Sequence, residues 1–204
     1  MKAVLISIQP KCCELIASGK KTVEVRKTKP KLKTPFKCYI YATMPKKWFR
    51  FSSWGKASDE SLFLSNGKVE MCDGFKFWAD KTEYELLNGK VIGEFVCKRC
   101  EVFPISSAPM RVLSALSLVP MPELYGYANG KSLYGWKISD LVIYDKPKPL
   151  SDFYTWKKCN SCKVSGYESA ACIYDENCKV PAVITRPPQS WRYIMEAKNE
   201  QHSF

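Results

Sequence analysis

The chain of 204 residues contains a single histidine, His202, close to its C-terminal end. With one histidine, RNA cleavage by a histidine pair and histidine-rich metal sites are excluded, and because this histidine lies in the expected C-terminal tail we expect no Ser-His-Asp triad. The glycine-rich phosphate loops G-x-x-x-x-G-K-[ST] and G-x-G-x-x-G are also missing. Any catalysis must therefore use lysine, carboxylate, tyrosine, threonine or thiol groups.

Long apolar runs are missing too. The N-terminal MKAVLISIQPK has only a short apolar stretch before Pro10, whereas a signal peptide needs a longer apolar core and a small-residue cleavage site. No run approaches the ~20 apolar residues of a membrane span. We therefore expect a cytoplasmic protein, monomeric and without a membrane partner.

Acidic residues are missing from one long segment. Between Val25 and Ser58 there is no Asp or Glu, although the formal net charge of the chain is +12 and the segment is rich in Lys and Arg. Such a charge favours a polyanionic partner, with RNA first. Cations interleaved with aromatic rings suit phosphates and stacked bases. We predict nucleic-acid contact by Lys27, Lys29, Lys31, Lys33, Lys46, Lys47, Trp48, Arg50 and Trp54.

The apolar pattern predicts more strands than helices. We expect a short helix between Pro10 and Gly19, helical pieces at 110–118 and 123–127, and another near 81–87. Strands are expected at 3–8, 22–26, 36–43, 91–103, 135–150 and 186–196. This pattern predicts an α+β, mainly β protein, built as a small mixed or antiparallel barrel with short helices and two inserted loop regions.

The segment SGKKTVEVRK, residues 18–27, is both charged and strand-like. Strict alternation predicts a strand with one buried face, where Val23 and Val25 point one way and Thr22, Glu24 and Arg26 point the other. Residues two apart on a strand lie about 6.5 Å apart on the same side. Glu24 and Arg26 can therefore share a pocket wall. The alternative is an ordinary solvent-exposed ion pair of little energetic weight.

Gly19, Lys21, Glu24 and Arg26 match the G-x-K-x-x-E-x-R signature of the ASCH domain, a branch of the PUA-like superfamily. The chain is similar to ASCH proteins of gut bacteria and their phages. The resemblance implies a PUA-like β-barrel over residues 1–155, with an insertion at about 44–89. A Cys-rich insertion at 157–180, a closing strand at 186–196 and a tail at 197–204 would complete the chain.

The resemblance also implies contact with RNA or a modified nucleoside. The ligand-binding residues would be Gly19, Lys20, Lys21, Thr22, Glu24 and Arg26. Some bacterial members resemble an amidohydrolase that deacylates acetylated cytidine with a Lys, a Thr and a distal Glu. Lys21 matches that Lys, but Glu24 stands in the Thr position. As a hydrolase or ribonuclease, the protein would use Lys21 and Glu24 as catalytic residues, with Glu101 or Glu123 as the distal acid. A protein-interaction module is a further alternative.

Ten cysteines are many for a cytoplasmic chain. The spacing Cys159-x2-Cys162-x9-Cys172-x5-Cys178 predicts a structural zinc site formed by these four thiolates, with free thiols or a disulfide as alternatives. Cys97 and Cys100 fall on one expected strand at an odd separation. We therefore expect them on opposite sides of that strand, where they cannot share a ligand.

Overall fold

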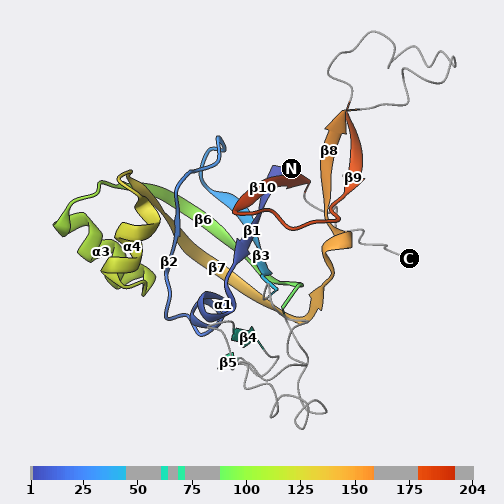
Figure 1. Cartoon of the computed structure of the whole chain (residues 1–204). Helices are drawn as coiled ribbons and strands as arrows, with labels where there is room; N and C mark the ends of the chain where they lie inside the picture. The colour runs from blue at the N-terminus through green and yellow to red at the C-terminus, as the bar shows by residue number, and fades with distance from the viewer. Residues whose placement is uncertain (1, 45–60, 64–68, 72–87, 159–178, 196–204) are drawn as a thin grey trace, which may run out of the picture.

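The computed structural model describes residues 2–44, 61–63, 69–71, 88–158 and 179–195, and within them the chain is mainly β (Figure 1). The main sheet has eight strands. They are β1 (Lys2–Ile8), β2 (Val23–Arg26), β3 (Phe36–Ala42), β6 (Val91–Phe103), β7 (Leu133–Lys148), β8 (Tyr154–Lys158), β9 (Lys179–Val183) and β10 (Trp191–Met195). The other elements are the ribbon of β4 (Ser61–Phe63) and β5 (Val69–Met71), the helices α1 (Pro10–Ala17), α3 (Ser107–Ser117) and α4 (Met121–Ala128), and a 3-10 turn, η2 (Leu150–Asp152).

The strands of the main sheet follow the order β2-β7-β6-β3-β1-β10-β8-β9. β1 pairs in parallel with β3, and the other neighbours are antiparallel. The mainly β, mixed-sheet fold class predicted from the sequence is therefore confirmed. Among the described residues, no helix is long and apolar enough to cross a membrane.

A side chain draws β2, at one end of this order, back toward β1. The Nη2 group of Arg26 donates a hydrogen bond to the Ser7 carbonyl oxygen on β1 at 2.6 Å. Its Nη1 group lies 3.4 Å from the Ser190 hydroxyl, just before β10. Among the described strands the backbone ladder itself stays open, and side chains such as Arg26 bridge the gap between β2 and β1.

Within the described residues, apolar side chains gather in one interior cluster and on two outer faces. The interior cluster lies between the curled strands and α1 and includes Val4, Ile6, Ile16, Phe95 and Trp136. A second cluster lies on the other face of β1 and β3, and a third lies between β2 and the helices α3 and α4. β2 is therefore covered by helices on its outer side (Figure 1).

The hairpin of β8 and β9 was not predicted. The sequence between 157 and 180 shows little apolar periodicity, yet Tyr154–Lys158 pairs with Lys179–Val183 at the far end of the sheet (Figure 1). The residues between these strands, and the helix expected near 81–87, lie outside the described residues.

Gly93 on β6 provides a test of the packing between β6 and β7. A Cβ atom at this position would overlap the Val142 carbonyl oxygen and lie 3.1 Å from Ile143 Cα. Gly93→Ala is therefore expected to lower the free energy of unfolding by about 1–3 kcal/mol, measured by denaturant titration.

Gly126 on α4 is the matched control, because a Cβ there meets nothing within 4 Å. Gly126→Ala is expected to stabilise by roughly 0.5–1 kcal/mol, since alanine favours the helix. Equal effects at both sites would contradict the close approach of the two strands.

Candidate functional site

The motif strand β2 is buried on both faces. Val23 and Val25 pack beneath α3 and α4, as the alternation predicts. Glu24 lies opposite Trp136 on β7, and directly opposed residues of an antiparallel pair share a face. Trp136 belongs to the interior cluster, so the charged side of β2 points into the barrel. The prediction of a single buried face is therefore wrong, because Glu24 is only 6% exposed and Arg26 only 8%.

Three charged side chains of the motif form a buried network. The Glu24 carboxylate accepts a hydrogen bond from Arg26 Nη2 at 2.8 Å, and Lys21 Nζ lies 3.5 Å from its other oxygen. Lys21, with 2% of its surface exposed, also donates to the Ser117 carbonyl oxygen at 2.7 Å. The network joins β2 to the end of α3 through Lys21, and to β1 through Arg26.

The other motif residues lie at the surface. Gly19 ends α1 with a φ of +72°, a conformation that favours glycine. Lys20 and Thr22 are exposed, and the Thr22 hydroxyl lies 3.4 Å from the Leu116 carbonyl oxygen. Of the predicted ligand-binding set, the structure therefore brings together Lys21, Glu24 and Arg26.

Two buried N–H groups beside the network have no acceptor within the described part of the chain. They are Arg26 Nε and Trp136 Nε1. Arg26 follows Glu24 by two residues, and Glu24 lies opposite Trp136, so both donors are on the interior face. A buried donor without a partner costs about 1–3 kcal/mol, and such groups are rare in folded proteins. The two donors are therefore unsatisfied hydrogen-bond groups on the interior side of the motif strand.

A cavity of 450 Å³ lies beside the interior cluster. The loop between β2 and β3 contributes Lys29, Leu32 and Lys33 to its wall, and β6 contributes Arg99 and Cys100. Leu32 and Cys100 also pack against the interior cluster, so they separate the cavity from the barrel interior. We call this space the basic cavity, since three cationic side chains line it.

The strand register connects the basic cavity to the charged network. Cys100 lies opposite Trp136 in the pairing of β6 with β7, and Trp136 lies opposite Glu24 in the pairing of β7 with β2. Neighbouring strands are about 4.8 Å apart, so the cavity wall and the Glu24 backbone are separated by roughly 10 Å. Neither Lys21 nor Glu24 is among the residues that line the cavity.

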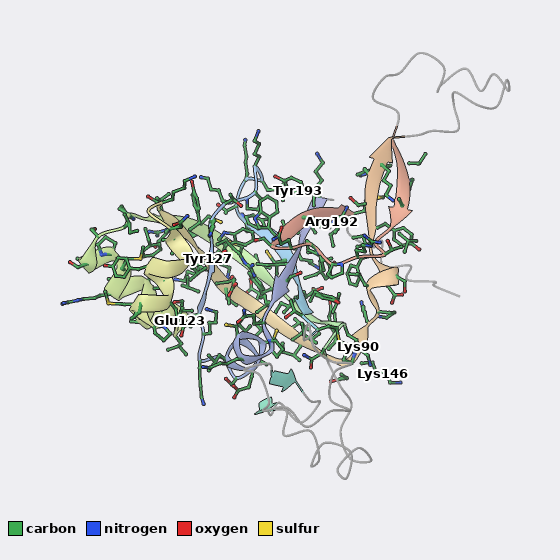
Figure 2. The ribbon with its side chains drawn as sticks, in the orientation of Figure 1. Lys90, Glu123, Tyr127, Lys146, Arg192 and Tyr193 are labelled. Carbon is green, nitrogen blue, oxygen red and sulfur yellow. The ribbon has the colours of Figure 1, made fainter. Side chains whose placement is uncertain are left out.

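The predicted cations of the β2–β3 loop stand at the surface. Lys27, Lys29, Lys31 and Lys33 are all exposed. Lys27 Nζ lies 4.8 Å from the centre of the Tyr127 ring, which Figure 2 places on α4 beside β2. The loop therefore presents positive charge at the surface, and two of its lysines, Lys29 and Lys33, line the cavity.

Two aromatic residues of β10, for which the sequence alone predicts no function, adjoin this loop. Trp191 Nε1 donates to the Thr28 hydroxyl at 3.0 Å, and the Lys31 backbone N–H donates to the Tyr193 hydroxyl at 2.7 Å. The two ring centres are 5.4 Å apart, and Figure 2 shows Tyr193 and Arg192 near the loop. The alternation Trp-x-Tyr in the expected closing strand was the signal that could have placed both rings on one side.

Solved structures resemble this chain over most of its length. The crystal structure of ASCH from Zymomonas mobilis matches with 16% identity and a TM-score of 0.49, covering 95% of this chain and 88% of that one. A serine-to-alanine mutant of that protein matches with 15% identity and a TM-score of 0.49, covering 95% and 89% of the two chains. A tyrosine-to-phenylalanine mutant matches with 16% identity and a TM-score of 0.49, covering 96% and 92%.

This chain resembles ASCH structures. At TM-scores of 0.49 and identities of 15–16%, this likeness carries no argument about function. No protein-family model matches the chain, and no curated protein matches it.

The two candidate distal acids have other surroundings. Glu101 pairs with Arg99 on β6. Glu123 is exposed on α4, as Figure 2 shows. In the described part of the chain, no ion pair joins either carboxylate to Lys21.

Several predicted site residues lie outside the described residues. They are Lys46, Lys47, Trp48, Arg50 and Trp54 of the basic stretch, and Cys159, Cys162, Cys172 and Cys178 of the predicted zinc site. Their roles stay predictions. Within the ranges that the structure describes, no group of three or more His, Cys, Asp or Glu side chains could hold a metal ion.

The expectation for Cys97 and Cys100 is wrong. Cys97 pairs with Ile138 and Cys100 pairs with Trp136. Between these two pairs β6 therefore advances by three residues while β7 advances by two. This β-bulge inserts one residue and turns both thiols to the same face. Their sulfur atoms are 3.5 Å apart.

Proposed function

We propose that the protein binds single-stranded RNA, or a modified nucleoside, at the basic cavity and the rings beside it. The observation that carries this proposal is a cavity of 450 Å³, lined by Lys29, Lys33 and Arg99, close to the rings of β10. Ligand pockets in proteins range from about 300 to 1,000 Å³, so a nucleoside fits this space.

The cations and the rings would contact different parts of the ligand. Lysine and arginine side chains at the rim hold phosphates without reading sequence. Tyr193 is 37% exposed, so one of its faces can stack with a base. This combination of positive charge and flat rings is typical of single-strand recognition.

For the buried network to read a base, the side chains of Leu32 and Cys100 would have to move aside, because they separate the cavity from the interior. Arg26 Nε and Trp136 Nε1 offer hydrogen bonds to carbonyl or ring-nitrogen acceptors. The Glu24 carboxylate offers an acceptor for an exocyclic amine. In this proposal Lys21 positions the carboxylate, and its contact with the Ser117 carbonyl oxygen supports that role.

Removing two cations from the cavity should weaken RNA binding. The double variant Lys29→Ala/Lys33→Ala is expected to lower affinity for a short single-stranded RNA about tenfold at low salt. It should also reduce the slope of log K against log salt by about 1.4, because each phosphate contact to a single strand contributes about 0.7. Fluorescence anisotropy of a labelled RNA over a salt series measures both quantities.

Lys146→Ala is the control for net charge. Lys146 is exposed on β7, and Figure 2 places it at the other end of the molecule from Arg192 and Tyr193. The Lys146→Ala variant should bind RNA almost as tightly as the wild type. An affinity that does not change with salt, or an equal loss in the Lys146 variant, would exclude the basic cavity as the RNA site.

A further inference from the structure

The two thiols on β6 differ in their access to solvent. Cys97 is fully buried in the interior cluster, whereas Cys100 is partly exposed and lines the basic cavity. A molecule in the cavity can therefore reach Cys100 Sγ first. Cys97 Sγ lies 3.5 Å from Cys100 Sγ, and Cys97 is not among the residues that line the cavity.

The surroundings favour a thiolate at Cys100. A hydrogen bond from Cys97 and the nearby Lys29 ammonium lower the pKa of the Cys100 thiol, against the opposing effect of its partial burial. The same hydrogen bond, together with burial, raises the pKa of Cys97. Burial raises the pKa values of the Cys13 and Cys38 thiols well above the ordinary value. Burial, with the Glu24 carboxylate nearby, also raises that of Cys12. Reactive cysteines usually occupy such electropositive, partly exposed positions.

We propose that Cys97 and Cys100 form a redox-active dithiol whose oxidant is an anionic low-molecular-weight disulfide bound in the basic cavity. Lys29, Lys33 and Arg99 supply the charge that attracts carboxylates of such a molecule. The cavity of 450 Å³ accommodates one arm of a small peptide disulfide. This site acts through its thiols, so it does not depend on RNA binding.

The exchange balances in two steps. Cys100 thiolate attacks one sulfur of the disulfide RSSR, an S–S bond forms between Cys100 and RS, and RS⁻ leaves. Cys97 then gives its proton to a departing RS⁻ as its sulfur attacks Cys100 Sγ and releases the second RS⁻. The protein loses two electrons and two protons, and the oxidant becomes two RSH. Closing the 3.5 Å gap to a bond of about 2.0 Å needs side-chain rotation within the bulge.

Peptide mapping can detect this reaction in the full chain. Trypsin cuts after Lys98 and Arg99, so the two cysteines fall into separate peptides, 91–98 and 100–111. After treatment with glutathione disulfide and alkylation, these two peptides are expected to appear as a disulfide-linked pair. Reduction with dithiothreitol should separate them. A mixed disulfide that persists on Cys100 without the link, or no reaction at either thiol, would overturn the proposal.

Single variants assign the roles of the two thiols. Cys97→Ser should trap glutathione on Cys100, because the resolving thiol is gone. Cys100→Ser should leave Cys97 unmodified over the same time. Cys12 serves as the internal reference, since it is also partly buried and its pKa is raised. Faster modification of Cys12 than of Cys100 would contradict the assignment, as would capture of glutathione by Cys97 alone.

The charge of the reagent tests the role of the cavity. Trapping on Cys100 in the Cys97→Ser variant should be several-fold faster with anionic glutathione disulfide than with cationic cystamine. Adding Lys29→Gln and Lys33→Gln should remove most of this difference. The rate with glutathione disulfide should rise with pH to a midpoint below the pKa of an ordinary thiol, because the surroundings lower the pKa of Cys100. Equal rates for both reagents, or a midpoint above that of an ordinary thiol, would contradict a thiolate held by this cavity.

Discussion

Glu24→Ala is expected to lower the free energy of unfolding by about 3–5 kcal/mol. The Glu24 carboxylate lies between Lys21 Nζ and Arg26 Nη2, and all three side chains are nearly inaccessible to water. Removing one partner of a buried ion pair leaves uncompensated charge in the interior, and that loss is much larger than the net value of the pair. Chemical denaturation with linear extrapolation measures the effect.

Glu123→Ala is the matched control for this substitution. Glu123 is exposed in the first turn of α4, so its removal should cost no more than about 1 kcal/mol through the helix dipole. Lys21→Met should cost less than Glu24→Ala, because Glu24 then keeps Arg26 and the aliphatic part of the side chain is preserved. If Glu24→Ala lowers the free energy of unfolding by less than Glu123→Ala does, the ion pair of Glu24 contributes no more than an ordinary surface ion pair.

Much of the fold follows from apolar alternation. The strand expected at 91–103 is β6 with the same bounds, and the one expected at 36–43 is β3, Phe36–Ala42. Gly19 and Pro10 place the ends of α1 to within two residues. These elements are predictable because each combines a local period with a local stop signal, and both act within a few residues of sequence.

The burial of charge on β2 could not be predicted in this way. A local pattern shows that Val23 and Glu24 point to opposite sides, but it cannot show what covers each side. The Ser117 carbonyl oxygen that pairs with Lys21 is 96 residues away, and the Ser190 hydroxyl near Arg26 is 164 away. Partners at such separations decide whether a charged face meets water or the interior.

The residues of the proposed site overlap the sequence prediction only in part. Lys29 and Lys33 belong to a charge run visible in the sequence, and the structure places both at the cavity, while their role stays a prediction. Arg99 was missed because its place at the cavity comes from the pairing of β6 with its neighbours. The proximity of Cys97 and Cys100 was missed because one inserted residue in β6 reverses the side on which every later residue falls.

Trp136→Ala is also expected to cost about 3–5 kcal/mol of unfolding free energy. Trp136 is fully buried, and its ring packs against two others. The ring centres of Trp136 and Phe36 are 5.7 Å apart, and those of Trp136 and Trp191 are 5.9 Å apart. Deleting such a side chain removes its transfer free energy and leaves a cavity at the centre of the barrel. The loss should appear as a lower denaturant midpoint with an unchanged m-value.

Trp136→Phe separates packing from hydrogen bonding at the same position. Phenylalanine keeps most of the buried ring, and the indole N–H has no acceptor to lose within the described part of the chain. The stability cost should therefore be small beside that of alanine, about 1–2 kcal/mol for the volume alone.

If the N–H serves a bound base, the Phe variant should bind RNA or nucleoside several-fold more weakly while staying folded. Trp191→Ala, nearer the surface, should reduce binding with a smaller loss of stability than Trp136→Ala. A Phe variant that binds as well as the wild type would remove Trp136 from the proposed site, because packing would then account for all that this side chain does.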